Sequence, residues 1–272
     1  MPDCENCPSR DGCKSQDSCG IRNNPNNHIG KVVGVMSGKG GVGKSTVSVL
    51  IAKELRSRGF AVGILDADIT GPSIPRLLGL AGKRAGQSDF GVLPAESGDG
   101  ISVMSINLLL SDESQPVIWR GPLVSATVKQ FWEEVYWGVL DYLIIDMPPG
   151  TGDVALTAMQ SIPINGMLIV SVPQDMVSMI VAKAVNMVKE LKIKLIGAVE
   201  NMSYVPCPKC GESIRIFEGD SVGFYKSLGL ELLGSLPMTG EIAAVSGAKP
   251  VLSEKINSEI ASITDKIISN LK

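Results

Sequence analysis

The stretch SGKGGVGKST, residues 37 to 46, constrains the fold of this chain more than any other feature. It follows an apolar run and opens a segment whose apolar residues recur at helical spacing, so it joins a buried strand to a helix. Four of its residues satisfy the pattern G-x-x-x-x-G-K-[ST]: Gly38, Gly43, Lys44 and Ser45. Such a loop lets backbone N–H groups converge on phosphate oxygens at the positive end of a helix. The chain is therefore predicted to bind a nucleotide here.

Each polar side chain of this loop has an expected role. Lys44 is expected to reach the β and γ phosphates of ATP, and the Ser45 hydroxyl to bind Mg²⁺. A flexible glycine-rich turn is the alternative, and the position between strand and helix argues against it. The remaining residues of the predicted ATP cradle are Gly38, Lys39, Gly40, Gly41, Val42, Gly43 and Thr46.

Apolar runs of strand length alternate with helical patterns from Lys31 onwards. The runs are VVGVM (32–36), AVGILD (61–66), ISVMSI (101–106), YLIID (142–146), GMLIVSV (166–172) and KLIGAVE (194–200). Strands this continuously apolar are buried on both faces, which indicates a mostly parallel sheet. The prediction is one α/β domain over residues 30–272, with helices on both faces of the sheet.

Two helices are predicted with particular bounds. The first covers residues 45–58, and Gly59 is expected to end it. The second covers about 251–271 and carries a row of large aliphatic residues on one face. A membrane-surface helix is one interpretation of that row. The absence of aromatic residues from it, and of a lysine-rich polar face, favours packing on the sheet.

Carboxylates end two of the predicted strands. LDADITGPS places Asp66 and Asp68 after one strand, and YLIIDMPPGTGD places Asp146 after another. A single Asp at a strand end is often a helix cap or a turn residue. An apolar run that ends in Asp, in a chain with a phosphate loop, is instead typical of the Walker B residue that holds Mg²⁺. Asp146 is therefore expected to hold the metal, and Asp66 to assist it. Asp68 is expected to orient or activate the attacking water. The Gly150 N–H is expected to sense the γ-phosphate.

The cysteines form two groups. Four lie in residues 1–29, a segment with few large aliphatic residues that cannot build its own core and is expected to be an arm: Cys4, Cys7, Cys13 and Cys19. The other two, Cys207 and Cys210, form a C-x-x-C pair in VPCPKCGE. A tetrahedral metal site needs four ligands, and this pair supplies two. Metal binding or redox chemistry is favoured over disulfides, and zinc, an iron–sulfur cluster and a redox dithiol all remain open.

Composition excludes several classes of function. The formal charge of −3 and the sequence pI near 5.4 provide no basic field for nucleic acid. No apolar run reaches 18 residues and no secretory signal opens the chain, so we expect no membrane partner and a cytoplasmic protein.

The loop resembles the deviant Walker A form, K-G-G-x-G-K-[ST], of dimeric ATPases that include the nitrogenase iron protein and the Min and Par proteins. That resemblance implies that Lys39 reaches across a homodimer interface to the partner's nucleotide. A lone loop lysine is otherwise usually solvated. Two lysines in one cradle would over-neutralise it unless one serves a second nucleotide.

The combination of this loop with DADITGPS, DMPPGTGD, an Asn-Met pair and a late C-x-x-C resembles the Mrp/ApbC family of nucleotide-binding iron–sulfur cluster carriers, over about residues 30–250. The resemblance implies that Asn201 reads the adenine ring and that Pro237 closes over the base. It also implies that Cys207 and Cys210 join the same pair of a second chain around a [4Fe–4S] cluster. Structural zinc, completed within one chain by Cys4 and Cys7, is the alternative.

The arm also resembles part of that family. CENCPSRDGC is similar to the N-terminal cluster motif of its cytosolic scaffold branch, but the upstream cysteine of that branch is absent, so Cys19 would be the fourth ligand of an arm cluster.

The implied function is a slow ATPase that carries a labile cluster to apo iron–sulfur proteins. Two alternatives remain open. One is a positioning ATPase with structural zinc, and the other is an electron-transfer ATPase similar to the nitrogenase iron protein.

Overall fold

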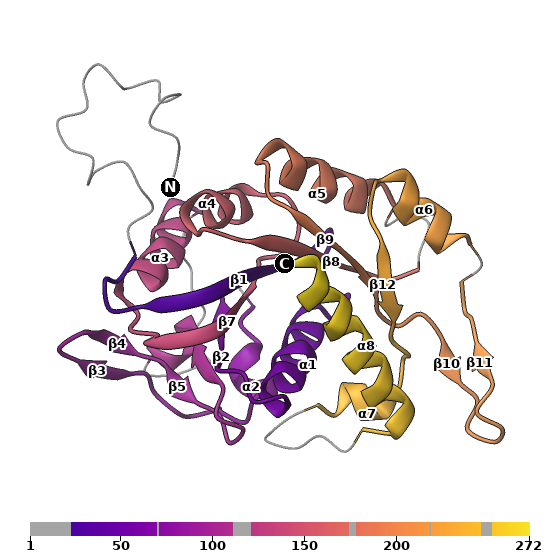
Figure 1. Ribbon diagram of the computed structural model, residues 1–272, viewed down its shortest axis with the longest axis horizontal. Helices are drawn as coiled ribbons and strands as arrows, with labels where there is room; N and C mark the ends of the chain where they lie inside the picture. The colour runs from indigo at the N-terminus through magenta and orange to yellow at the C-terminus, as the bar shows by residue number, and fades with distance from the viewer. Residues whose placement is uncertain (1–22, 70, 111–120, 174–177, 218, 246–251) are drawn as a thin grey trace.

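The structure is a computed structural model, and it describes residues 23–69, 71–110, 121–173, 178–217, 219–245 and 252–272. A single eight-stranded sheet forms the centre of the molecule (Figure 1). Its strands in spatial order are β12 (Leu232–Ser235), β9 (Leu195–Glu200), β8 (Gly166–Ser171), β1 (His28–Ser37), β7 (Val139–Asp146), β2 (Val62–Asp66), β6 (Ser102–Met104) and β5 (Ala95–Glu96). Every neighbouring pair is parallel except β5 with β6. The predicted mostly parallel α/β sheet is confirmed.

Helices cover both faces of the sheet (Figure 1). One face carries α1 (Lys44–Ser57) and α8 (Glu254–Asn270), and the other carries α3 (Gly121–Glu134), α4 (Asp153–Ser161) and α5 (Ser178–Glu190). The shorter helices are α2 (Ile74–Leu77), a 3₁₀ turn (Ile106–Leu108), α6 (Ser221–Ser227) and α7 (Gly240–Ala243). This arrangement buries the central strands on both sides, which explains why β2 and β8 are buried along their whole length.

Both predicted helices are present with nearly the expected bounds. The first ends at Ser57, and Gly59 then takes a left-handed φ of 91°, a conformation that favours glycine. In α8 the aliphatic row is buried, with Ile263 and Ile267 at most 2% exposed. The row packs in the core rather than on a membrane surface. Among the helices that the structure describes, none combines the length and apolar character needed to cross a bilayer.

Two small hairpins lie outside the main sheet. One pairs β3 (Gly86–Ser88) with β4 (Gly91–Leu93), and the other pairs β10 (Val205–Pro206) with β11 (Ser213–Ile214). Figure 1 shows the β10–β11 hairpin standing away from the sheet, beyond the edge strand β12. The cysteine pair therefore lies on a projection, whereas the phosphate loop lies at the centre of the domain.

Candidate nucleotide and cysteine sites

The phosphate loop joins β1 to α1 at the carboxyl end of the sheet. Gly41 and Gly43 both have φ of 79°, a left-handed conformation that glycine adopts without steric cost. Gly43 is also the N-cap of α1, so the loop backbone runs directly into the positive end of that helix. A Cβ atom added at Gly40 or Gly41 would meet nothing within 4 Å, so the space next to this backbone is open to a ligand. These features fit a phosphate cradle.

Asp146, at the end of β7, is the central acceptor of the site. Its carboxylate is fully buried and forms a 2.7 Å ion pair with the Lys44 ammonium, which is 6% exposed. The Ser45 hydroxyl donates to Asp146 Oδ2 over 2.6 Å, and the Ser48 hydroxyl donates to Oδ1 over 2.7 Å. The structure thus places Lys44, Ser45 and Asp146 together. A carboxylate oxygen next to a serine hydroxyl is the donor set that suits Mg²⁺ with part of its water shell.

Asp66 ends β2 directly beside Asp146 in the parallel register. It is 1% exposed and accepts hydrogen bonds from the Asp68 and Ile74 N–H groups and from the Ser105 hydroxyl. Burial raises the pKa of the Asp66 carboxyl well above its usual range. The nearby negative charge of Asp146 raises that pKa further, and Lys44 opposes the shift. Two buried carboxylates side by side repel each other, and a divalent cation between or beside them would relieve that repulsion.

Asp68 lines the cavity above the phosphate loop. The cavity has a volume of about 310 Å³ and is bounded by Ser37, Gly40, Gly41, Gly43, Lys44, Ser45, Thr46, Asp68, Gly71, Ser73, Leu77 and Pro149. The predicted water-activating residue and the predicted phosphate cradle therefore share one cavity. A hydrogen bond from the Gly71 N–H to Asp68 Oδ1, 3.3 Å long, shapes the turn that carries Asp68.

Gly150 follows Asp146 in the loop after β7 and has φ of 81°. Its N–H donates to the Ser37 carbonyl over 2.9 Å and so ties this loop to the end of β1. The expected role as a γ-phosphate sensor stays a prediction, and it requires this hydrogen bond to be exchanged for one to the nucleotide.

Asn201 lies under the phosphate loop. It is 2% exposed, and its Nδ2 group donates to the Val42 carbonyl over 2.9 Å. Its Oδ1 atom is buried and accepts no hydrogen bond from any residue that the structure describes. A buried carbonyl oxygen without a donor fits an incoming N–H group. Base recognition by Asn201 remains a prediction, as does the closing role of Pro237, which is buried beyond the end of β12.

Sequence reasoning missed two hydroxyl groups of this site. Ser48 is fully buried on the inward face of α1, four residues after Lys44, and it is the polar exception in an apolar face. A serine among the apolar residues of that face could have been recognised in the sequence as a residue of the site. Ser105 could not, because its contact with Asp66 arises only when β6 pairs with β2.

The cysteine pair forms a tight knuckle between β10 and β11. The Cys207 N–H donates to the Glu212 carbonyl over 2.8 Å, and the Gly211 N–H donates back to the Cys207 carbonyl over 2.9 Å. Hydrogen bonds from the backbone N–H groups of Cys210 and Lys209, and from the Cys210 thiol, lower the pKa of the Cys207 thiol. Backbone donors that favour the thiolate form of Cys207 suit a soft metal or a cluster.

The described residues of one chain supply only two ligands to this cysteine site. Cys207 is half-buried and Cys210 is exposed, and both are unpaired thiols. Across the described ranges, no group of three or more cysteine, histidine or acidic residues is positioned to hold a metal ion. Cys4, Cys7, Cys13 and Cys19 lie outside the described residues. Lys39 is half-buried on the phosphate loop, and its proposed reach into a partner stays a prediction.

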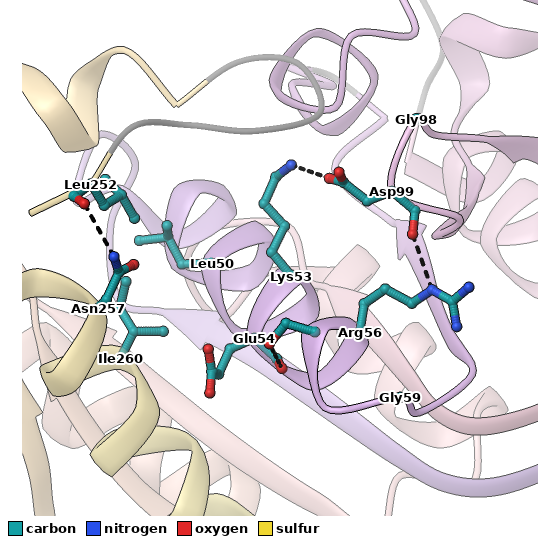
Figure 2. Close-up of a pocket in the computed structure, with 11 residues that line it drawn as sticks. Leu50, Lys53, Glu54, Arg56, Gly59, Gly98, Asp99, Leu252, Asn257 and Ile260 are labelled. Carbon is teal, nitrogen blue, oxygen red and sulfur yellow. Dashed lines mark hydrogen bonds and ion pairs between the residues drawn. The ribbon is translucent and has the colours of Figure 1, made fainter. Parts of the chain in front are cut away.

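A second hollow of about 730 Å³ lies between α1, α8 and the turn at Gly98–Asp99 (Figure 2). It is larger than the cavity at the phosphate loop. Two of its cationic side chains, however, contact Asp99: the Lys53 ammonium meets the Asp99 carboxylate, and Arg56 Nε donates to the Asp99 carbonyl over 3.0 Å. Figure 2 shows Lys53 and Arg56 converging on Asp99 from the same helix. These contacts join α1 to the β5–β6 turn and occupy polar groups that could otherwise bind a ligand.

Comparison with protein families and curated proteins points to one group. A family model described as ParA, NUBPL iron-transfer P-loop NTPase, matches residues 28–272. An iron-sulfur cluster carrier protein of Clostridium perfringens is 46% identical over 88% of this chain and 89% of its own length. One from Methanocaldococcus jannaschii is 43% identical over 99% of this chain and 96% of its own length. A cytosolic Fe-S cluster assembly factor, the Nubp2 homolog of Drosophila grimshawi, is 42% identical over 89% of this chain and 95% of its own length.

Solved structures agree with these matches. A nucleotide-binding protein of Archaeoglobus fulgidus in complex with ADP is 43% identical, with a TM-score of 0.71 over 80% of this chain and 85% of that one. The cell division ATPase MinD of Pyrococcus furiosus has a TM-score of 0.63 over 88% of this chain and 99% of that one, at 19% identity. The second likeness shows the shared P-loop fold alone.

Proposed function

Because the chain belongs to the family of NUBPL iron-transfer P-loop NTPases, we propose that it is an ATP-dependent carrier that binds an iron–sulfur cluster and passes it to apo-proteins. One observation carries the proposal. A nucleotide cradle, in which one chain brings Lys44, Ser45 and Asp146 together, shares its domain with a projecting knuckle that holds two thiols and lacks further ligands among the described residues.

The nucleotide half acts through positioning and charge. Lys44 neutralises the phosphates, and Ser45 with Asp146 holds the Mg²⁺ that accompanies ATP. Asp68, which lines the same cavity, orients the water that attacks the γ-phosphate. Asp66 supports the metal from beside Asp146. Lys39 reaches the nucleotide of a partner chain, and turnover is slow because the site is complete only in the dimer.

The cysteine half acts as one side of a shared site. Two copies of the knuckle related by a two-fold axis bring four thiolates together, the ligand set of a [4Fe–4S] cluster. A cluster held between two exposed knuckles is open to an acceptor, which suits transfer rather than storage. The hydrogen bonds that lower the pKa of the Cys207 thiol favour the thiolate that ligation requires.

The remaining parts follow from this function. The cysteines near the N-terminus, Cys4, Cys7, Cys13 and Cys19, assist in loading or hold a second cluster. The ATPase domain begins at His28 rather than at the predicted residue 30, because His28 and Ile29 belong to β1 and pair with β7. The cytosol is the proposed compartment, as the name of the Drosophila relative indicates for that protein. The recipients are apo iron–sulfur proteins.

Cluster transfer tests this function. The full chain, reconstituted anaerobically with iron and sulfide, is mixed with an apo-enzyme that needs a [4Fe–4S] cluster, and recovery of that enzyme's activity is followed. Recovery is expected from the wild-type protein and from a Ser227→Ala control at an exposed position of α6, and none from Cys207→Ala/Cys210→Ala. If instead the knuckle keeps one zinc per chain and takes up no iron, the pair is a structural zinc knuckle and the carrier function is wrong.

A further inference from the structure

A single buried carboxylate contacts both ends of the segment that carries the two cysteines. Glu200, the last residue of β9, is 2% exposed. Its Oε1 atom accepts a 3.4 Å hydrogen bond from the Ser203 hydroxyl, before the hairpin, and a 3.0 Å hydrogen bond from the Ser221 hydroxyl, after it. Ser221 is the first residue of α6. One side chain therefore ties together both ends of the excursion that contains Cys207 and Cys210.

The next residue along the chain contacts the phosphate loop. Asn201 donates to the Val42 carbonyl over 2.9 Å, and a side chain at Gly43 would come within 2.2 Å of its Nδ2 atom. The Asn201 amide thus fills the space that the missing Gly43 side chain leaves. Any shift of the loop backbone at Val42 or Gly43 must move Asn201 or break this contact.

A strained residue links these two contacts. Met202 has φ of 55°, a left-handed conformation that residues other than glycine rarely adopt. It stands between Asn201, which is held by the loop, and Ser203, which is held by Glu200. Such a conformation persists where the surroundings fix the backbone on both sides, and it is common in segments that switch.

We propose that Glu200 is a positioning residue that couples the phosphate loop to the cysteine knuckle, so that nucleotide binding changes the orientation and exposure of Cys207 and Cys210. The inference rests on the proposed carrier function and specifies how its two sites communicate. The route runs from Val42 and Gly43 through Asn201 and Met202 to the Glu200 clamp. The clamp then turns a small movement at the loop into a rotation of the whole hairpin.

Thiol alkylation measures this coupling without relying on cluster transfer. The cluster-free full chain is treated with N-ethylmaleimide in the absence and presence of saturating Mg²⁺ and a slowly hydrolysed ATP analogue. Modification of Cys207 and Cys210 is followed by peptide mass spectrometry. In the wild type we expect the nucleotide to change the rate about fivefold or more, the usual scale of coupling between two sites. In Glu200→Ala and Ser221→Ala we expect that ratio to fall toward one while analogue affinity stays within about twofold, whereas Glu200→Gln, whose Oε1 atom can still accept both hydrogen bonds, should keep the wild-type ratio.

Matched variants separate coupling from simple damage to the hairpin. Ser221→Thr keeps the hydroxyl and should restore the ratio, and Ser227→Ala, on the exposed side of the same helix, should leave it at the wild-type value. A wild-type ratio of one, or an unchanged ratio in both clamp variants, overturns the proposal. Iron uptake is measured on the same proteins: normal loading without nucleotide-dependent alkylation rejects the clamp and keeps the carrier, whereas no loading in the wild type rejects the carrier itself.

Discussion

The phosphate-loop region and the β10–β11 hairpin differ in how much of a site one chain supplies. At the loop, three side chains of this chain donate to one buried carboxylate, that of Asp146. At the hairpin, two thiols sit on a projection of four strand residues, and the described part of the chain brings up no further ligand. One chain therefore supplies the described residues of the phosphate cradle, whereas a four-thiolate site at the hairpin needs two more thiols, which we propose come from a second chain.

The difference follows from where the two regions stand in the fold. Parallel strands bring their carboxyl ends to one edge, so Asp66 and Asp146 meet the phosphate loop as a direct result of sheet pairing. The strands β10 and β11 pair with each other rather than with the main sheet. Its local order comes from backbone hydrogen bonds within the knuckle, such as the one from the Cys207 N–H to Glu212. A rigid site suits phosphoryl transfer, and a projecting one suits transfer of a cluster.

The largest expected effect is at Lys44. Lys44→Ala removes the cation from the phosphate cradle and should lower ATP hydrolysis by about 10²–10³-fold, the usual loss for one preorganised electrostatic group. Lys44→Arg keeps the charge beside Asp146 and the fold, but its planar group does not replace the ammonium and should also lose most activity. Steady-state phosphate release measures both.

Lys53 provides the matched control for that experiment. It lies on the same helix but faces the second hollow, where it pairs with Asp99 (Figure 2). Lys53→Ala should change hydrolysis by no more than about twofold. A Lys44→Ala variant that hydrolyses ATP as fast as Lys53→Ala would contradict the distinction between the two cavities.

A smaller effect is expected at Asp66. Its pKa is raised by burial and by Asp146, so the folded protein holds this proton more tightly than the unfolded chain. The stabilisation is complete at pH values below the unfolded pKa and is lost as pH rises through the raised folded pKa. Without Mg²⁺, Asp66→Asn should therefore melt about 2 °C higher than the wild type at pH 8, the shift that about 1 kcal/mol gives a domain of this size.

The pH dependence of that difference is the sharper readout. The difference in melting temperature between Asp66→Asn and the wild type should be smaller at pH 5, where more of the wild-type carboxyl is protonated. It should also be smaller at pH 8 when Mg²⁺ is present. Asp89→Asn, at an exposed position, should show neither change. An Asp66→Asn variant that is less stable than the wild type at every pH would mean that the carboxylate is required for packing rather than held for a cation.

The sequence predicts the nucleotide region better than the rest for a physical reason. The phosphate loop, Asp66 and Asp146 are marked locally, by glycines and by carboxylates that end apolar runs, and their meeting follows from parallel pairing. The strand β12 escaped prediction because LLGS is short and its burial arises from pairing with β9 and packing under α8. The Glu200 clamp escaped because its partners, Ser203 and Ser221, are separated by the hairpin and carry no pattern of their own.

Iron content and native mass of the anaerobically reconstituted protein, measured for the wild type and for Cys207→Ala/Cys210→Ala, test the shared cluster site most directly. Both proteins carry Cys4→Ser/Cys7→Ser/Cys13→Ser/Cys19→Ser, which removes the other four thiols. With Cys207 and Cys210 intact we expect about four irons per dimer, with a Mössbauer spectrum typical of a [4Fe–4S] cluster. Iron and dimer mass should be lost together in the double variant. A monomer that keeps one zinc per chain at this pair, and takes up no iron, would contradict the claim that the hairpin is half of a shared cluster site.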